Sequence, residues 1–533
     1  MKTATRPEEI RKEYEACVSY NRGIGLYDTV RQNEQFYIGR QWEGLNAPDL
    51  DKPVLNFLKR VGSYIVAMLV SDDIAVEVSP FDPSPEKERA ARLLSAEIER
   101  VIENTKAKSL MRDMLRNCVV DGDGCFYWYY DCAAEGPQSV RGDICLELID
   151  NTRVLFGNPF IQEVQKQPYI LIVKREQLET VRERARRFSG AKAQDIRPDN
   201  DALYAGESAY SPSDLVTVIV KLYRREGGVW FTEVTRDAVV RPATDTGYRR
   251  YPLSYMSYEK IKNSYHGQAI VTGLIPNQIA VNKLWAMAIH HQNTMAFPKV
   301  FYDRLKIKSW SNRVGEAIGV AGNPSEAVTT AFKAPDMSAQ LIEVVNRTIE
   351  YTKEFMGASD AALGNVRPDN TSAIIAVQKA TAAPLDLQRL ALYQFVEDYV
   401  RIIADMICAT YGPRRVRFTD ENGEPSFESF DFSKLDLQSM QLKVEVGASA
   451  YWSELTQLGT LDSLFAKGII DDALVYLESV PDSYIRNKGR ILQRLRERKD
   501  ELKIPALKGK TQAKSFSEIL NEGKEKANAL QTL

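Results

Sequence analysis

Histidine and cysteine are scarce in this chain of 533 residues. It has three histidines, and His290 and His291 are adjacent, so they face different sides of a helix. No two of the six cysteines form a C-x-x-C pair. Because zinc sites and disulfide frameworks follow recognisable cysteine spacings, we expect buried free thiols in a reducing cytoplasm. A metal site and histidine-based catalysis are not expected.

Long apolar runs are also absent. The most apolar stretch, residues 61–70, is about half as long as the roughly 20 residues that a membrane-spanning helix needs. The charged N-terminus lacks the apolar segment of a signal peptide. We therefore expect a soluble protein that is made inside the cell and has no membrane partner.

Neither sign of charge is in excess. Lysine and arginine total 70, against 72 aspartate and glutamate residues. Each phosphate contact to DNA needs a cation, and affinity grows steeply with the number of such contacts. This balance predicts that a DNA partner, if there is one, is held loosely or through a local patch.

The familiar catalytic motifs are missing as well. The chain contains no G-x-x-x-x-G-K-[ST], no H-E-x-x-H and no G-x-S-x-G. The DGDG segment that ends at Gly124 resembles the start of a calcium loop, but Cys125, Phe126 and Cys132 occupy positions that need oxygen ligands or glycine. No enzyme, cofactor or metal is predicted. A nuclease with two metals held by distant carboxylates stays open as an alternative.

Composition and periodicity predict an α+β protein that is mainly helical. At 44% hydrophobic residues the chain is globular, and its length exceeds the roughly 250–300 residues of a single core, so we expect two to four packed regions. Helices are expected at residues 8–20, 27–37, 54–70, 86–102, 110–120 and 177–188. Strands are expected at 74–78, 144–149, 169–173, 215–223 and 229–234, the last two joined as a hairpin through Glu226-Gly227-Gly228.

Two stretches of this first half are polar. The helix at 177–188 carries four arginines, which suit either a solvated face or a DNA-binding face, and we favour the solvated face. Residues 190–213 are rich in Pro, Asp, Ala and Ser, and we interpret them as a surface excursion.

Two long helices follow in the central part of the chain. The first spans residues 274–296, with Pro276 in its first turn and Leu284 in an apolar stripe. Ser338 caps the second, where Leu341, Val344, Thr348, Tyr351 and Phe355 line one side. A stripe this narrow needs a neighbour on each flank. A monomer provides one neighbour, whereas a ring provides both.

The segments beside these helices carry the remaining candidate residues. Positive charge between the helices comes from Lys299, Arg304, Lys306 and Lys308, for which we favour a solvated strand edge. A loop with Asp360, Arg367 and Asn370 follows the second helix. The next helix runs to about residue 411, and Pro384 is expected to kink it.

Four segments of the chain resemble the portal proteins of tailed bacteriophages, which form the head-tail connector ring. They are NEQFYIGRQWEG, SYHGQAIVTGLIPNQIAVNKLWA, NTSAIIAVQKATAAPLDLQ and SELTQLGTLDSLFAKGIIDDALVYLESVP. Their order and spacing carry the resemblance, which extends over most of the chain. It implies a portal fold with an α/β wing, a two-helix stem, a small α/β clip, a long kinked helix and a helical crown.

The resemblance also implies a division of the chain. The parts are the wing (1–267), stem helix 1 (268–296), the clip (297–337), stem helix 2 (338–357), the tunnel loop (358–370), the kinked wing helix (371–411), a wing or crown β segment (412–450), the helical crown (451–502) and a C-terminal tail (503–533). Leu284, Leu341, Val344, Tyr351 and Phe355 would then pack the stem.

The function implied by the resemblance is a dodecameric ring at one capsid vertex. Double-stranded DNA would be packaged and ejected through its channel, with Arg367, Asn370 and Asp360 facing the DNA. An ion pair between neighbouring loops is an equal reading of Arg367. The clip cations would dock the large terminase subunit and later the head-tail adaptor.

Other partners and the place of the protein follow in the same way. The resemblance implies contacts with major capsid and scaffolding proteins, synthesis in the host bacterial cytoplasm, and a final location in the virion. A helical scaffold that forms no channel is the second alternative, because heptad spacing by itself does not exclude it.

Overall fold

A computed structural model describes residues 6–48, 50–70, 74–82, 84–135, 141–190, 195–199, 214–296, 299–309, 311, 317–332, 339–355, 385–419, 425–446, 449–470, 473–480, 485, 488, 490–492 and 494–495. Helices and strands are mixed, which confirms the α+β class. The chain forms two compact units. The first comprises Met1–Val70, Lys106–Tyr129 and Cys145–Ile402, and the second Ser71–Thr105, Tyr130–Ile144 and Ile403–Leu533.

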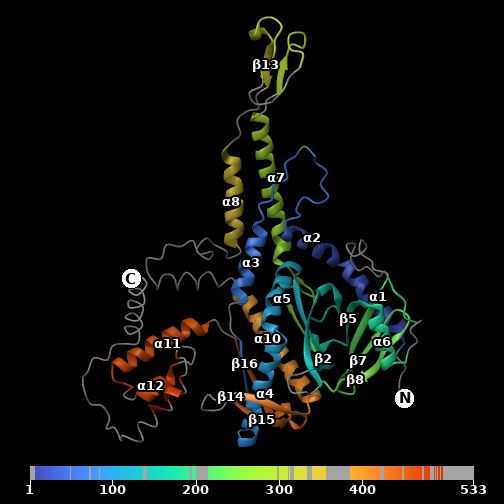
Figure 1. The fold of residues 1–533 in the computed structure, drawn as a ribbon, viewed down its shortest axis with the longest axis vertical. Helices are drawn as coiled ribbons and strands as arrows, with labels where there is room; N and C mark the ends of the chain where they lie inside the picture. The colour runs from blue at the N-terminus through green and yellow to red at the C-terminus, as the bar shows by residue number, and fades with distance from the viewer. Residues whose placement is uncertain are drawn as a thin grey trace. The chain divides into compact units, whose positions relative to one another are not determined.

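A five-stranded antiparallel sheet forms the β part of the first unit (Figure 1). Its strands are, in spatial order, β4 (Val154–Phe156), β5 (Tyr169–Gln177), β6 (Leu215–Arg225), β7 (Gly228–Val234) and β8 (Val239–Asp245). The predicted β6–β7 hairpin is confirmed, with Glu226 at φ 55° and Gly227 at φ 83°. Two successive positive φ values are the geometry of a tight hairpin turn, which explains the glycine.

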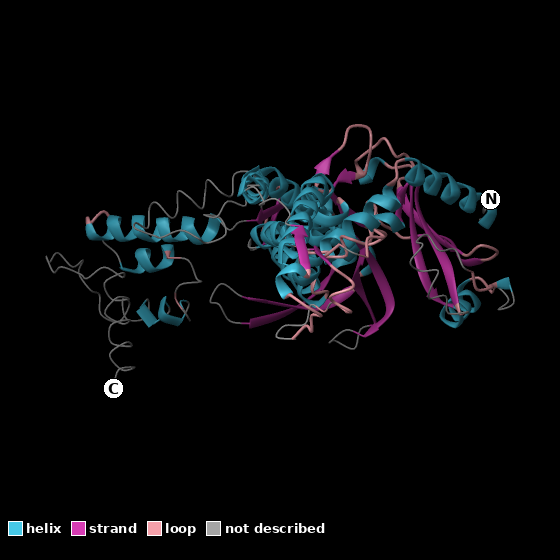
Figure 2. Ribbon diagram, turned by 90° about the horizontal axis from the view of Figure 1, so that it is seen from above, coloured by secondary structure: helices cyan, strands magenta, loops and turns pink. Residues whose placement is uncertain are grey.

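Helices cover both faces of this sheet (Figure 2). Side chains alternate between the faces of a strand, so Val173 and Ile219 pack with α1 (Pro7–Gly23), whereas Val216 and Val218 pack with α6 (Leu178–Phe188). The sheet is therefore buried on both sides.

Residues 195–199, the described segment of the polar stretch 190–213, contact α6 and the five-stranded sheet. Ile196, within the expected surface excursion, is buried among the α6 contacts, and the Asp199 carboxylate accepts hydrogen bonds from Arg175 at 2.5 Å and Thr217 N at 2.9 Å. Asp195, Arg197 and Pro198 are exposed, as a surface excursion predicts, but the prediction is wrong for Ile196, because its apolar side chain and the Asp199 ion pair anchor the segment. The rest of 190–213 beyond Gly190 lies outside the described residues.

Two of the four arginines of α6 make ion pairs, whereas Arg186 and Arg187 are exposed, as a solvated face predicts. Arg182 pairs with Glu179 at 2.8 Å and donates to Ile196 O at 3.0 Å, and Arg184 pairs with Glu176 and Glu233. Arg184 ties the helix to β5 and β7, and Arg182 ties it to the segment 195–199, so the prediction of a solvated face is wrong for these two arginines.

A second sheet of three strands follows the order β3 (Arg141–Ile149), β2 (Asp123–Glu135) and β9 (Leu253–Ser257). The aromatic part of β2 packs on α10 (Asp386–Thr410). The ring centres of Phe126 and Phe395 are 5.3 Å apart, and those of Trp128 and Tyr399 are 5.6 Å apart. Cys125 is buried here, as are Cys17 and Cys118, but Cys132 near the end of β2 is exposed. The expected burial is therefore wrong for Cys132.

Four helices complete the described core of the first unit: α2 (Leu26–Ile38), α3 (Phe57–Val70), α5 (Ala107–Asp121) and α7 (Ile270–Ala296). Helix α7 begins four residues earlier than predicted, so Pro276 lies in its interior and not in the first turn. Proline normally costs a helical hydrogen bond there. Burial of Val271, Leu274 and Ile275 offsets that cost, which periodicity does not reveal.

The second unit is built around α4 (Pro85–Asn104), which Ser84 caps by accepting a hydrogen bond from Lys87 N at 3.3 Å. Strand β1 (Ile74–Pro80) pairs with β16 (Met440–Val446), near the other end of the chain. The hairpin of β14 (Pro413–Thr419) and β15 (Pro425–Asp431) also packs on α4. Helices α11 (Ser449–Ala466) and α12 (Ala473–Ser479) contact each other through Phe465 and Tyr476.

Candidate functional site

Helices α7 and α8 (Ala339–Phe355) lie side by side (Figure 1). Asn277 Nδ2 donates to Thr352 Oγ1 at 3.1 Å across the pair. On α8, Val345 and Thr352 are 1% and 2% exposed, and their seven-residue spacing places them on one side of the helix. This side of α8 is the one that packs within the chain.

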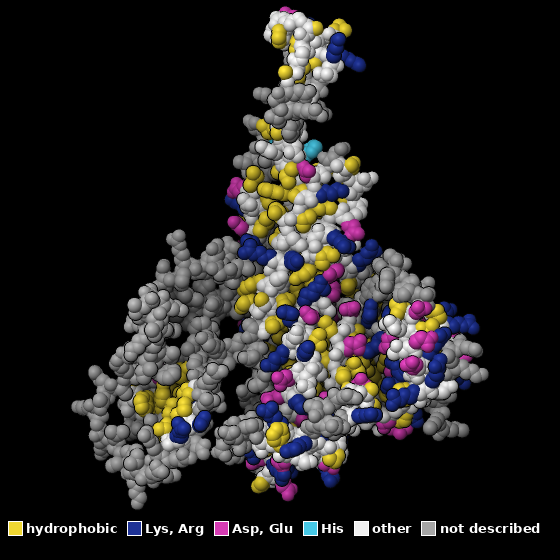
Figure 3. Space-filling view, in the orientation of Figure 1, with side chains coloured by type: hydrophobic (Ala, Val, Ile, Leu, Met, Phe, Trp, Pro, Cys, Tyr) yellow, Lys and Arg dark blue, Asp and Glu magenta, His cyan; other side chains and the backbone are white. Residues whose placement is uncertain are grey.

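On α8, the stripe predicted to pack the stem is displaced by one residue from the buried side that carries Val345 and Thr352. Val344 and Tyr351 are 51% and 53% exposed, and Leu284 on α7 is half-buried. Leu341 and Phe355 lie on α8, but their side chains are outside the described part. In Figure 3 hydrophobic side chains are visible on this pair, with charged groups beside them. Val344 and Tyr351 therefore face solvent in the single chain, and their packing role stays a prediction.

The base of α7 is held by buried amide side chains. Gln278 Nε2 donates to Leu55 O at 2.8 Å and to Asn282 Oδ1 at 2.9 Å. Asn282 Nδ2 in turn donates to Gln41 Oε1 at 2.6 Å. Buried polar groups that satisfy one another rigidify the elements that carry them. Helix α7 is thus fixed to the segment that joins α2 to α3.

A buried carboxylate organises the turn that leads into α7. Asp123 accepts hydrogen bonds from Gly267 N at 2.8 Å and Asn151 Nδ2 at 3.2 Å, and lies 2.9 Å from His266 Nδ1. A Cβ on Gly122 would lie 2.6 Å from Gly267 O, so the glycine is required for this close approach. No local pattern predicts this cluster, because its residues come from the DGDG segment and the SYHGQ segment, which lie far apart in the sequence.

The carboxylate of Asp121, which lies beside this cluster, lacks a hydrogen bond to one of its oxygens within the part of the chain that the structure describes. Its Oδ1 is buried with no hydrogen-bond partner among the described residues. Burial raises the pKa of Asp121 to about 7, Arg116 lowers it, and Glu34, Asp150 and Asp123 raise it further. The ionised carboxylate is therefore disfavoured in the folded protein.

Replacing Asp121 with Asn should stabilise the protein above pH 7. The folded-state pKa is higher than the unfolded value, so the wild type loses stability as pH rises from about 4 to about 7. Asparagine cannot ionise, and we expect a gain of about 2–4 kcal/mol at pH 8 and none at pH 4. Urea unfolding of both proteins at the two pH values measures this. Asp113→Asn, exposed on the same helix, is the control, and an equal gain at both pH values would contradict the assignment.

The predicted clip contains the hairpin of β12 (Lys299–Tyr302) and β13 (Val328–Phe332). Lys299 lies on β12, and Arg304 and Lys308 are exposed in the segment after it. Lys306 is half-buried and pairs with Glu326 at 3.0 Å. Of the four predicted docking cations, Lys306 is thus the one for which the described part of the clip shows an ion pair.

The predicted tunnel-loop residues Arg367, Asn370 and Asp360 lie outside the described residues, as does Pro384. Helix α10 begins at Asp386, two residues after Pro384. The placement of these residues stays a prediction.

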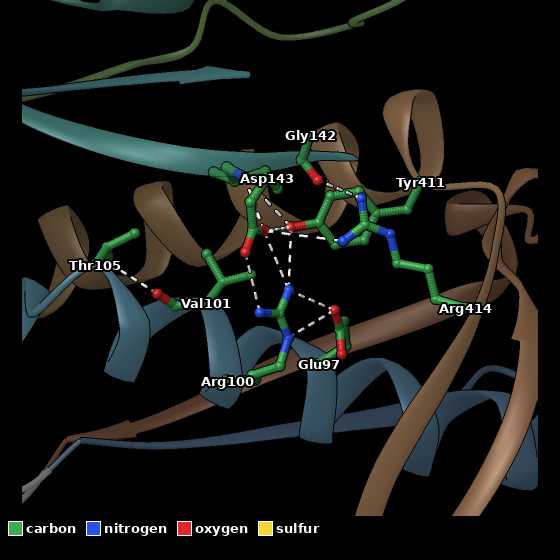
Figure 4. Close-up of polar contacts among 9 residues, drawn as sticks. Glu97, Arg100, Val101, Thr105, Gly142, Asp143, Tyr411 and Arg414 are labelled. Carbon is green, nitrogen blue, oxygen red and sulfur yellow. Dashed lines mark hydrogen bonds and ion pairs between the residues drawn. The ribbon is translucent and has the colours of Figure 1, made fainter. Parts of the chain in front are cut away.

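A charged network in the second unit joins three elements (Figure 4). Arg100 on α4 forms two hydrogen bonds of 3.1 Å with Asp143 and one of 2.9 Å with Glu97. The Tyr411 hydroxyl also donates to Asp143, and Arg414 donates to Gly142 O at 2.7 Å, with its guanidinium 3.5 Å from the Tyr411 ring centre. Two cations and two carboxylates thus balance in a largely buried site.

The pKa shifts agree with this pairing. Burial works against the charged forms, but the hydrogen bonds with Arg100 and Tyr411 outweigh it and lower the pKa of Asp143. For Arg100, the hydrogen bonds to Asp143 and Glu97 outweigh burial and raise the pKa. Both residues are therefore charged at neutral pH, and the network is structural.

A polar cleft of about 370 Å³ lies in the first unit. Two of the cations that line it, Lys174 and Arg175, form ion pairs with carboxylates. Lys174 pairs with Glu147 over the stacked rings of Tyr127 and Tyr129, and Arg175 pairs with Asp199. This arrangement does not indicate a particular ligand. Within the described ranges, no three His, Cys, Asp or Glu residues are grouped to hold a metal ion. None of the helices that the structure describes has the length and apolarity to cross a membrane.

The chain thus combines a mixed fold with two long paired helices, α7 and α8, and a β-hairpin that lies between them in the sequence. Residues 213–447, somewhat less than half of the chain, match the model of the phage P22-like portal protein family. The matched region contains α7, α8, α10 and every strand from β6 to β16. It confirms the resemblance to tailed-phage portal proteins and supports a phage portal function. No curated protein matches the chain.

Proposed function

We propose that the chain forms a ring at one vertex of a phage capsid and that DNA is packaged and ejected through the channel of this ring. The family match over residues 213–447 is the observation that carries the proposal. The portal family is structural, not enzymatic. Capsid association and an oligomeric assembly follow from the family, and the ring of twelve, its scaffolding and capsid contacts, and its synthesis in a bacterial host are part of the proposal.

The exposed side of α8 supports assembly. Val345 and Thr352 face α7 within the chain, whereas Val344 and Tyr351, rotated by one residue, are about half exposed. Apolar side chains in this arrangement suit a second helix pair from a neighbouring subunit. The stem would comprise residues 268–296 and 338–357, the wing 1–267 and 371–411, and the crown 451–502, with 412–450 between them and 503–533 as a tail.

Sliding of DNA is consistent with the charge balance of the chain. Lysine and arginine do not outnumber aspartate and glutamate, so the protein lacks the general basic excess of proteins that hold DNA tightly. The loop of residues 358–370, with Arg367, Asn370 and Asp360, would contact the passing duplex. The clip, residues 297–337, would dock the large terminase subunit and later the head-tail adaptor through its cations.

Negative-stain images of the purified chain test the ring. Rings with a central hole are the expected result. Monomers or rods under all buffer conditions would overturn the proposal and favour a helical scaffold without a channel. Cleavage of DNA by the pure chain with magnesium or manganese would instead favour a nuclease.

Deleting residues 358–370 should leave rings intact but impair packaging or retention of DNA. The flanking helices, not this loop, would hold the ring together. Virions made with the deletion are compared with wild type by the amount of protected genome per particle, and the rings are imaged in parallel. A Gly-Ser segment of equal length in place of the loop controls for chain connectivity. Loss of assembly in both variants would show that the segment is structural.

A further inference from the structure

An exposed leucine stands out in the predicted clip. Leu305 is 90% exposed, and Phe301 on β12 is more than half exposed. Single exposed apolar residues are common on protein surfaces and need no explanation by themselves. Leu305 differs because the turn that carries it is tightly built.

Hydrogen bonds fix this turn from several sides. The Asp303 carboxylate accepts from Leu305 N at 2.9 Å, and Asp303 O accepts from Ile307 N at 2.9 Å. Asp303 N donates to Ala327 O, and Ala321 N donates to Lys306 O, both at 2.9 Å. These bonds tie the turn to the return segment of the clip. A side chain on such a turn loses little backbone freedom when it binds.

Buried groups beneath the turn add to its stability. Ile307 and Ala327 are both buried, and Lys306 forms its ion pair with Glu326 here. The apolar residue at 307 therefore serves the clip's own packing, whereas the one at 305 is left outside it. The turn presents Leu305 in a defined position.

Two exposed cations flank Leu305 in the chain. Arg304 precedes it, Lys308 follows three residues later, and both are exposed. The nearby acidic groups are engaged within the clip, Asp303 with the turn and Glu326 with Lys306. An apolar side chain with a cationic border is complementary to an apolar pocket with an acidic border. Duplex DNA fits less well, because phosphate contacts use the cations and leave the leucine exposed.

We propose that Leu305 is the apolar anchor with which the clip docks into an apolar pocket, bordered by carboxylates, on a partner protein. This inference rests on the proposed function, in which the clip docks the large terminase subunit and the head-tail adaptor. Arg304 and Lys308 then accelerate and orient the encounter, and Leu305 holds the complex once it has formed.

The test measures binding of purified full-length rings to the large terminase subunit and to the head-tail adaptor of the same phage. Leu305→Asp should weaken binding of at least one partner by about 30-fold or more, mainly through faster dissociation. Leu305→Met should retain most of the affinity. The double variant Arg304→Gln, Lys308→Gln should slow association by about 3–10-fold at low salt and less at high salt. Leu45→Asp, an exposed leucine far away in sequence, is the matched control.

The outcomes separate the inference from the function on which it rests. If wild-type rings bind neither partner, the proposed docking function of the clip is overturned, and so is the role of Leu305 as its anchor. If wild-type rings bind but Leu305→Asp rings bind equally well, the anchor is overturned and docking stands. If Leu305→Asp prevents ring formation in negative-stain images, the leucine contacts a neighbouring copy of the chain, and the inference is overturned.

Discussion

Replacing Val344 and Tyr351 with aspartate should abolish ring formation while leaving the single chain folded. Both side chains are about half exposed, so the substitutions remove little packing within the chain. Burying each of them in a neighbouring subunit would contribute about 1–2 kcal/mol per contact. A carboxylate buried there without a partner would cost several kcal/mol more. Each subunit of a ring makes the contact with its neighbours, so the loss is repeated around the ring.

Size-exclusion chromatography with light scattering measures the loss of assembly, and circular dichroism shows whether the chain stays folded. Glu343→Gln with Arg347→Gln is the control, because these residues are exposed on the same helix and pair with each other at 2.7 Å. The control should assemble normally. Intact rings in the aspartate variant would show that this side of α8 faces solvent in the assembly.

Replacing Asp143 with Asn should destabilise the second unit by about 2–4 kcal/mol at pH 7. The Asp143 carboxylate pairs with Arg100, accepts from Tyr411 and lies 4.0 Å from Arg414. Its removal leaves the two guanidinium groups with Glu97 as the remaining carboxylate of the network. A neutral amide of the same size cannot compensate for the charge. The melting temperature should fall by about 5 °C or more, which differential scanning fluorimetry measures.

The pH dependence provides a second readout for Asp143. Its folded-state pKa is below the unfolded value, so the stability that it contributes is present at neutral pH and is lost as pH falls below about 4. The difference between wild type and Asp143→Asn should therefore shrink as pH falls through this range. Asp82→Asn, whose carboxylate is mostly exposed, should change little at any pH. A constant difference between wild type and Asp143→Asn would show that the amide acts through packing.

Local patterns in the sequence predict most of the described helices and strands. The helix that became α4 and the β6–β7 hairpin are examples, since a cap, an apolar period and a turn glycine all lie within a few residues of each other. Such features do not say which distant segments meet. The pairing of Ile74 with Val446 joins opposite ends of the chain and leaves no local pattern.

At the candidate site, too, local sequence patterns predict an element but not what it contacts. Seven-residue spacing predicts an apolar side of α8, but Val344 and Val345 are neighbours in the chain, and Val344 is half exposed whereas Val345 is buried. A rotation of about 100° per residue separates these two faces, and apolar residues occur on both. Only the position of α7 decides which face is buried within the chain.

By itself, the sequence determined the mixed α+β class, the lack of familiar catalytic motifs and the resemblance to portal proteins that the family match supports. The tertiary structure decided which polar residues meet: Asp123 with His266, and Asp143 with Arg100 and Tyr411. It also decided that Leu305 stays exposed while Ile307 is buried two residues later. The reason is physical. Periodicity records how one element repeats along itself, whereas burial and pairing depend on what the rest of the chain places against it.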